Sequence, residues 1–230
     1  MRNLYCMMTV VRRELGERVI TFFKKSGMKT AFARLCNGTA QQKTLDYLGL
    51  EKTEKILITT FGTEEICKKV SHDLITKMNI DIPGNGISII IPFDSVGGKT
   101  TLEHLAKGQD LEKGEVKDVN NMDYSLIIVI AESGNTDAVM DAARSAGARG
   151  GTVVHAKGTA NDSIKSTFFG VTVASEKEML YIVSRKADRD TIMKAIMEKA
   201  GAHTSAKAMV FSLPVESVVG LRSLTETEEE

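Results

Sequence analysis

The stretch that decides the fold begins with YSLIIVIA at residues 124–131 and continues through NTDAVMDAARSAG at 135–147 to GGTVVHA at 150–156. The first piece is a nearly continuous apolar run, which is typical of a central strand. The second places apolar residues at helical spacing, and Gly147 would end that helix. The third is a short β-branched run. Together they predict strand, helix, strand.

Three further pieces complete the pattern after a polar, Gly/Thr-rich stretch at residues 157–175, which we expect to be a loop. EMLYIVS at 178–184 and KAMVFSL at 207–213 read as strands. RDTIMKAIMEKAG at 189–201 reads as a helix between them. The order βαββαβ is the split βαβ, or ferredoxin-like, plan.

The same plan occurs twice in the chain. At an offset of 120 residues, NGTA at 37–40 falls on KGTA at 157–160, and at an offset of 122, PFDSVGG at 92–98 meets PVESVVG at 214–220. Such self-similarity indicates duplication. The first copy predicts strands at 4–11, 30–36, 55–61 and 87–92, and helices at 17–26 and 63–78.

The sequence therefore predicts an α+β protein of two tandem ferredoxin-like domains with antiparallel sheets. We expect a divergent first repeat at 1–98, a linker with a short helix at 99–122, a second repeat at 123–221 and an acidic tail at 222–230. Two helices would cover one face of each sheet. The other face would be left for a partner, either the other copy or another chain.

Composition excludes several classes of protein. Lys plus Arg equals 30 and Asp plus Glu equals 30, so the net charge of zero argues against a broad nucleic-acid surface. No apolar run is long enough to predict a membrane-spanning helix. Three cysteines without a CxxC pair indicate no disulfide framework and a cytoplasmic protein. No spacing supports a metal site, and no tightly bound cofactor is expected.

Two strand-end loops are candidate binding sites. Lys157, Gly158 and Thr159 follow a predicted strand, where a lysine and a hydroxyl beside a glycine could bind phosphate. The turn Gly84-Asn85-Gly86 precedes another strand and could present backbone N–H groups to an anion. Ordinary turns explain both loops equally well. No nucleophile–base pair or catalytic motif stands out, so the chain is not expected to be an enzyme.

Several stretches together closely resemble the nitrogen-regulatory P-II signalling family. They are DAARSAGARGGTVVHAKGT at 141–159, EKEMLYIVSRK at 176–186, IMKAI at 192–196 and VFSLPVESVVGL at 210–221. The first copy matches more weakly over residues 4–98. The whole chain thus looks like a divergent tandem P-II-like protein.

The resemblance implies a fold, ligands and partners. Members form trimers and bind adenine nucleotides, often with 2-oxoglutarate and magnesium, in clefts between subunits. A long loop after the second strand engages transporters or enzymes of nitrogen metabolism. A tandem chain would give a homotrimer that is a pseudo-hexamer. The loop of the first copy contains Tyr47, which we expect to be a packed aromatic rather than a modification site.

The resemblance also implies which residues bind the ligand. Its pattern matches the strand-end loops of both copies at Gly38, Thr39, Gln42, Gly84, Asn85, Gly86, Lys157, Gly158, Thr159 and Lys207. The match is incomplete. The second copy has Asp162 in place of the glutamine and Gly220 in place of a basic residue, and the first copy has Ile87 in place of a lysine. Neither copy alone carries a full nucleotide site.

The leading interpretation is a sensor that binds a small anionic metabolite or an adenine nucleotide, such as ATP, ADP, AMP or a cyclic dinucleotide. Binding would order a loop and change contact with a regulated enzyme or membrane transporter. An interaction module without a small ligand is the alternative, and a small enzyme on the same scaffold is a third. Fold alone does not decide among them.

Overall fold

The computed structural model describes residues 4–39, 54–82, 84–93, 99–111, 122–157, 167–168, 171–172 and 176–221. They form two compact units. Unit 1 combines the described parts of Met1–Asn37, Glu51–Ser125 and Leu213–Glu230, and unit 2 combines those of Gly38–Leu50 and Leu126–Ser212. The repeat boundaries expected from the sequence stay a prediction, since contact units need not coincide with sequence repeats.

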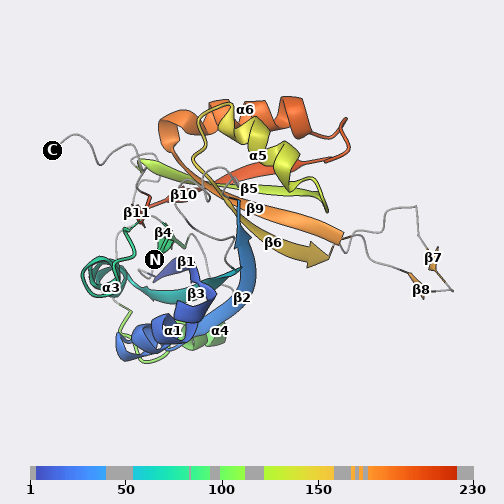
Figure 1. The fold of residues 1–230 in the computed structure, drawn as a ribbon. Coiled ribbons are helices and arrows are strands. Elements are labelled where there is room, and N and C mark those ends of the chain that lie inside the picture. The colour runs from blue at the N-terminus through green and yellow to red at the C-terminus, as the bar shows by residue number, and fades with distance from the viewer. Residues whose placement is uncertain are drawn as a thin grey trace. The chain divides into compact units, whose positions relative to one another are not determined.

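Unit 1 is an antiparallel sheet with two long helices (Figure 1). Its strands lie in the order β2-β3-β1-β4-β11, with α1 and α3 as the helices. Its elements are β1 (Leu4–Arg12), η1 (Arg13–Leu15), α1 (Gly16–Lys25), β2 (Ala31–Gly38), β3 (Glu54–Thr63), α3 (Glu64–Met78), β4 (Gly86–Pro92), α4 (Lys99–Leu105) and β11 (Ser217–Val219).

Unit 2 repeats the plan, and Figure 1 shows its two helices side by side over one face of its sheet. The strand order is β10-β5-β9-β6. Its elements are β5 (Tyr124–Glu132), α5 (Thr136–Arg144), β6 (Thr152–Lys157), β7 (Thr167–Phe168), β8 (Val171–Thr172), β9 (Glu176–Arg185), α6 (Lys186–Ala200) and β10 (Met209–Val215).

Both sheets place the fourth, first, third and second strands of the βαββαβ plan in that order, so the predicted ferredoxin-like α+β class is confirmed. Some details differ from the prediction. The expected loop at 157–175 contains the short pair β7–β8, α6 begins three residues earlier, at Lys186, and β11 was not expected. The short helix expected in the linker is present as α4.

Each unit has its own core between helices and sheet. In unit 1, Met7 and Ile58 pack with Phe23 and Leu74 from the two helices. In unit 2, Ile127, Val129 and Leu180 pack with Met140 and Ile196 in the same way. Since side chains alternate along a strand, every second residue of β1 and β5 faces these helices. The continuous apolar run of β5 fits its place inside the sheet.

The second face of the unit 1 sheet is partly covered by the chain itself. Leu4 and Phe61 pack there with Leu102, Leu105 and Leu111 from α4 and the residues after it. The side chain of Gln109 fastens this segment, since its Nε2 donates to the carbonyl of Phe61 at 3.0 Å and its Oε1 accepts the N–H of Thr63 at 3.0 Å. This part of the expected linker therefore belongs to unit 1 and occupies surface that the sequence assigned to a partner.

Candidate functional site

The glycine turn predicted in the first copy lies at one end of the unit 1 sheet. Val11 pairs with Gly86 across β1 and β4, and the next residue, Arg12, pairs with Lys55 across β1 and β3. Cys36, near the end of β2, is the other partner of Lys55. At this end of the sheet β1 and β2 finish while β3 and β4 begin, so the side chains of four strands meet there.

Packing explains why this turn contains glycine. A Cβ added at Gly86 would lie 2.4 Å from the carbonyl oxygen of Val10, so the neighbouring strand leaves no room for a side chain. Gly84 has a φ of 88°, in the left-handed region that favours glycine. The side chain of Asn85 donates to the carbonyl of Asn79 at 2.9 Å and holds the turn to the end of α3. The turn is therefore rigidly built before any ligand is considered.

Two basic residues that the sequence did not single out lie beside this turn. The ammonium group of Lys55 donates to the carbonyl of Gly84 at 3.2 Å. Burial lowers the pKa of Lys55, and the nearby Arg12 guanidinium lowers it further, while Cys36 acts in the opposite direction. Among the described residues, no carboxylate forms an ion pair with Lys55. A desolvated cation thus faces a second cation.

The positive charge of Arg12 is only partly compensated by other protein groups. One of its terminal nitrogens lies 3.1 Å from Glu14, but its Nε is buried and has no hydrogen-bond partner in the described part of the chain. Arg13, the next residue, pairs with Glu54 instead. Removing a charged nitrogen from water without a partner costs free energy. An anion at this strand end would relieve both the unsatisfied Nε and the repulsion between Arg12 and Lys55.

The equivalent end of the unit 2 sheet is electrically different. At the repeat offsets of 120 and 122, Arg12 corresponds to Glu132 and Lys55 to Lys177. Here Glu132 and Lys177 form an ion pair at 2.5 Å. The N–H of Glu132 also donates to the carbonyl of Ala206 at 2.9 Å. The lysine of unit 2 is therefore neutralised within the fold.

Two predicted residues of the second copy, Lys157 and Lys207, lie at this end of the unit 2 sheet but on its opposite edges. Lys157 ends β6 and pairs with Glu176 of β9, while Lys207 precedes β10 at the opposite edge of the strand order. Three strand spacings of about 4.8 Å separate those edges, or about 14 Å. A ligand that contacts both lysines would have to span that width. Lys207 is exposed and has a φ of 44°.

The remaining predicted residues divide into two groups. Gln42, Gly158 and Thr159 lie outside the described residues, as does the side chain of Lys157. Thr39, which follows Gly38 at the end of β2, is grouped with unit 2 and is held by protein groups: its hydroxyl donates to the carbonyl of Gly151 at 3.0 Å and accepts the N–H of Gly151 at 2.8 Å. Both contacts involve the hydroxyl of Thr39, which is the group that a ligand would need.

A buried carboxylate in unit 2 was also missed by sequence reasoning. Glu178 has a side chain only 8% exposed, and it accepts a hydrogen bond from the hydroxyl of Thr136 at 2.7 Å. His155 Nδ1 lies 3.9 Å from the other carboxylate oxygen. The equivalent place in unit 1 is apolar, since a Cβ at Gly16 would lie 3.0 Å from Ile56. A glutamate inside a strand gives no sequence signal of its own burial.

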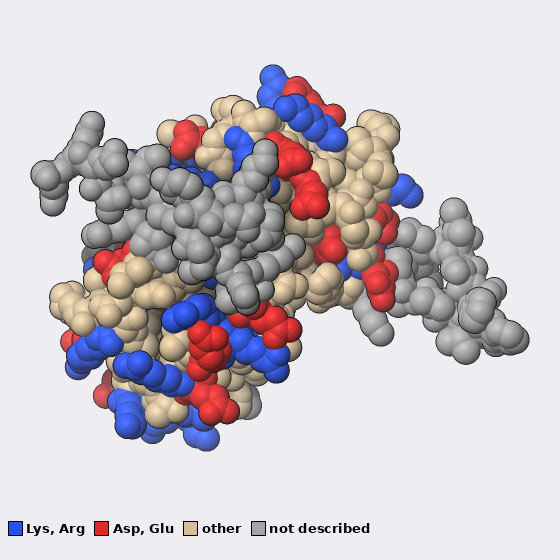
Figure 2. All heavy atoms as spheres, in the orientation of Figure 1, with Lys and Arg blue, Asp and Glu red and all other residues tan. Residues whose placement is uncertain are grey.

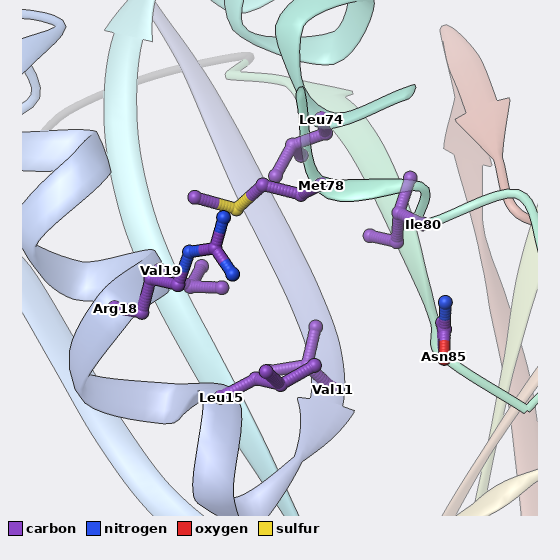
Figure 3. A pocket seen from close by; sticks show the side chains of 8 residues that line it. All are labelled: Val11, Leu15, Arg18, Val19, Leu74, Met78, Ile80 and Asn85. Carbon is purple, nitrogen blue, oxygen red and sulfur yellow. The ribbon is translucent and has the colours of Figure 1, made fainter. Parts of the chain in front are cut away.

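A small cavity in unit 1 adjoins the glycine turn on the helix side of the sheet. It measures about 20 Å³ and is lined by Val11, Leu15, Arg18, Val19, Leu74, Met78, Ile80 and Asn85. Figure 3 shows the guanidinium of Arg18 reaching over it toward Met78. That volume is close to the space one water needs, so the cavity does not fit a nucleotide.

Charge on the surface is mixed. Figure 2 shows Lys and Arg side chains interspersed with Asp and Glu on the visible face of the described residues. Among the described residues, no group of three His, Cys, Asp or Glu side chains is placed to hold a metal ion. None of their helices combines the length and apolar character that crossing a membrane requires.

The second half of the chain is similar to a known protein family. Residues 124–225 match the family model "Nitrogen regulatory protein P-II". Among solved structures, the chain is similar to the PII protein of Arabidopsis thaliana bound to citrate, with 20% identity and a TM-score of 0.33, over 43% of this chain and 81% of that one. No curated protein matches. The resemblance to the P-II family read from residues 141–221 is therefore confirmed, since residues 124–225 of this chain match that family's model.

Proposed function

We propose that this chain is a non-enzymatic regulatory sensor that binds a small anion at the strand end of unit 1. The observation that carries the proposal is a pair of cations beside the glycine turn Gly84–Gly86. Lys55 has no carboxylate partner among the described residues, and the Nε of Arg12 has no hydrogen-bond partner among them. The family match of residues 124–225 supports a regulatory role. Phosphate and carboxylate groups are the anions that such cations bind best.

An adenine nucleotide is the proposed ligand class, because it brings phosphates to the cations. We further propose that ligand binding changes contact with a regulated enzyme or membrane transporter, and that the chain assembles as a homotrimer. Binding alters a partner contact only if the ligand prefers one conformation over another. Light scattering at micromolar concentration tests the assembly, and a clean monomer would contradict it.

Calorimetric titration of the full chain tests the ligand. ATP, ADP, AMP and cyclic di-adenylate are titrated with and without 2-oxoglutarate and magnesium. We expect micromolar binding by at least one nucleotide. Lys55→Met should weaken it about tenfold, the loss of one charge-assisted contact of about 1.4 kcal/mol. Lys177→Met is the matched control, because Lys177 is paired with Glu132 and should change nothing.

The same titration compares the sites of the two copies. If Lys157→Ala or Lys207→Ala weakens binding while Lys55→Met does not, the ligand binds at unit 2 and the proposed site is wrong. If a well-folded chain gives no heat with any of these ligands, the sensor proposal fails.

An interaction module without a small ligand is the second candidate, and one observation favours it. Strand β10 exposes Met209, Phe211 and Leu213, which are 60%, 43% and 39% exposed and alternate along one face. An apolar row of this kind suits a protein contact. Phe211→Ser would then abolish assembly or partner binding, while Lys55→Met would leave both unchanged.

A further inference from the structure

Residues near the end of the chain are held against the glycine turn of unit 1. Strand β11 pairs with β4, with Val218 opposite Ile89, and the N–H of Glu216 donates to the carbonyl of Ile90 at 2.8 Å. Figure 1 shows the two strands adjacent. The next glycine, Gly220, has a φ of 83°, and a Cβ on it would lie 2.4 Å from the carbonyl oxygen of Gly86. The chain therefore leaves unit 1 beside the turn.

The sequence beyond this anchor is acidic. Residues 222–230 read RSLTETEEE, with four glutamates and one arginine, a net charge of −3 from 1 − 4. The strand end beside the anchor carries Arg12 and Lys55, and Lys55 has no carboxylate partner among the described residues. Carboxylates lie at the same strand end: Glu14 pairs with Arg12, Glu54 pairs with Arg13, and Glu17 lies beside them. The positive charge that lacks a carboxylate partner among the described residues is that of Lys55, and the charge of residues 222–230 is opposite to it.

The distances allow contact. Lys55 lies on β3, three strands from β11, which is about 14 Å at ordinary strand spacing. Its ammonium group already extends toward β4 as far as the carbonyl of Gly84. Glu226 is five positions after Leu221 in the sequence, and five fully extended residue steps span up to about 17 Å. Glu226 and the glutamates after it can therefore reach Lys55.

We propose that the acidic residues 226–230 bind the Arg12–Lys55 cations of unit 1 and compete there with the anionic ligand. The proposal rests on the proposed function of that site. The tail would then supply a carboxylate partner for Lys55, as Glu132 does for Lys177 within unit 2. Because the tail is tethered, its effective concentration is of millimolar order, so even a weak contact lowers apparent affinity for the ligand.

Neutralising the tail tests the competition. The variant Glu228→Gln, Glu229→Gln, Glu230→Gln is compared with the parent chain in a titration with ATP. We expect the variant to bind about three- to tenfold more tightly at 50 mM NaCl, the range that a weak tethered competitor gives. The difference should disappear at 0.5 M NaCl, since salt screens the tail's contact.

A matched control removes the same charge elsewhere. Asp141→Asn, Asp190→Asn, Glu198→Gln neutralises three exposed carboxylates on the helices of unit 2, whose side chains are 69%, 78% and 61% exposed. This control should bind ATP as the parent does. Equal tightening in the control and the tail variant would mean that overall charge, not the tail, is responsible, and would overturn the proposal.

A second readout needs no ligand. Acylation of Lys55 by an amine-reactive reagent is measured by peptide mass spectrometry, with the 73% exposed Lys194 as reference. Lys55 should react more in the tail variant than in the parent. Unchanged ATP affinity with unchanged Lys55 acylation overturns the tail proposal and leaves ligand binding intact. If no chain binds ATP, the proposed function fails on that probe, and the Lys55 acylation ratio decides the tail contact by itself.

Discussion

The strand ends of the two units share a backbone plan and differ in charge. In unit 1, Arg12 and Lys55 face each other as two cations, whereas in unit 2 the equivalent Glu132 and Lys177 neutralise each other. The unit whose sequence matches the P-II family is the one with the neutral strand end. The unit that matches the family model and the unit that does not therefore share the strand order and differ in the charges at the strand end.

The units also differ beneath their first helix, and there it is unit 2 that has the polar side chains. Where unit 1 packs Gly16 against Ile56, unit 2 places Thr136 in a hydrogen bond to the buried carboxylate of Glu178. Unit 1 is thus apolar beneath its first helix and charged at its strand end. Unit 2 buries the side chain of Glu178 beneath its first helix and pairs Lys177 with Glu132 at its strand end.

The largest expected effect comes from filling the glycine turn of unit 1. Gly86→Val places a Cβ 2.4 Å from the carbonyl oxygen of Val10 and should destabilise the chain by about 2–3 kcal/mol. Gly150→Val is the control, because nothing lies within 4 Å of a Cβ there. Urea unfolding followed by circular dichroism measures both. Equal stability of the two variants would show that β1 does not constrain the turn.

Removing the hydrogen bond to the buried carboxylate of unit 2 should cost about 1–3 kcal/mol. Thr136→Val leaves Glu178 without its donor. Thr76→Val, on the exposed face of α3, is the same substitution and should cost almost nothing. The double variant Thr136→Val, Glu178→Leu should regain most of the loss, since it imitates the apolar contact of unit 1. No recovery would mean that Glu178 is stabilised by other groups.

Converting the strand end of unit 1 to the charge pattern of unit 2 should weaken nucleotide binding. Arg12→Glu would pair with Lys55 as Glu132 pairs with Lys177, and we expect at least a tenfold loss of ATP affinity, about 1.4 kcal/mol. Calorimetry measures the loss. The reciprocal Glu132→Arg should leave ATP affinity at the proposed site unchanged. An equal loss from both substitutions would argue against a site confined to unit 1.

Raising the pH should weaken anion binding before ordinary lysines lose their charge. The pKa of Lys55 is lowered from 10.5, first by burial and then by Arg12. Between the folded pKa and 10.5 the unfolded chain binds more protons, so the contribution of Lys55 to stability rises with pH while its affinity for an anion falls. The pH profile of Lys55 acylation checks this, and Arg12→Glu should move the profile to higher pH.

The smallest expected effect concerns an exposed ion pair at the same strand end. Arg13 pairs with Glu54, and both side chains are more than half exposed. Solvent screens such pairs, so Arg13→Ala should change stability by no more than about 0.5 kcal/mol. Thermal unfolding measures it. A loss comparable with that of Thr136→Val would mean that Arg13 contributes through packing or another contact.

Periodicity and the repeat predicted the fold well, because both depend on local sequence. The apolar run of β5 and the stripe of α3 appear where expected, and both units have the same strand order. Lys55 and Arg12 could not be found this way. Their meeting depends on the register that pairs β1 with β3, which no local pattern encodes. The strand β11 was missed for a similar reason, since the three residues Ser217, Val218 and Val219 predict little without their partner β4.

The pairing of β11 with β4 has a consequence for how the protein is made. During synthesis, the outer edge of β4 at Ile89 stays uncovered until Val218 of β11 has been added to the chain. At translation rates of 5–20 residues per second, that wait is roughly ten seconds. During it, unit 1 carries an open strand edge, the feature through which partly made chains join one another. The first unit to be synthesised is therefore the last to be finished, and conditions that slow the ribosome should increase capture of the nascent chain by chaperones.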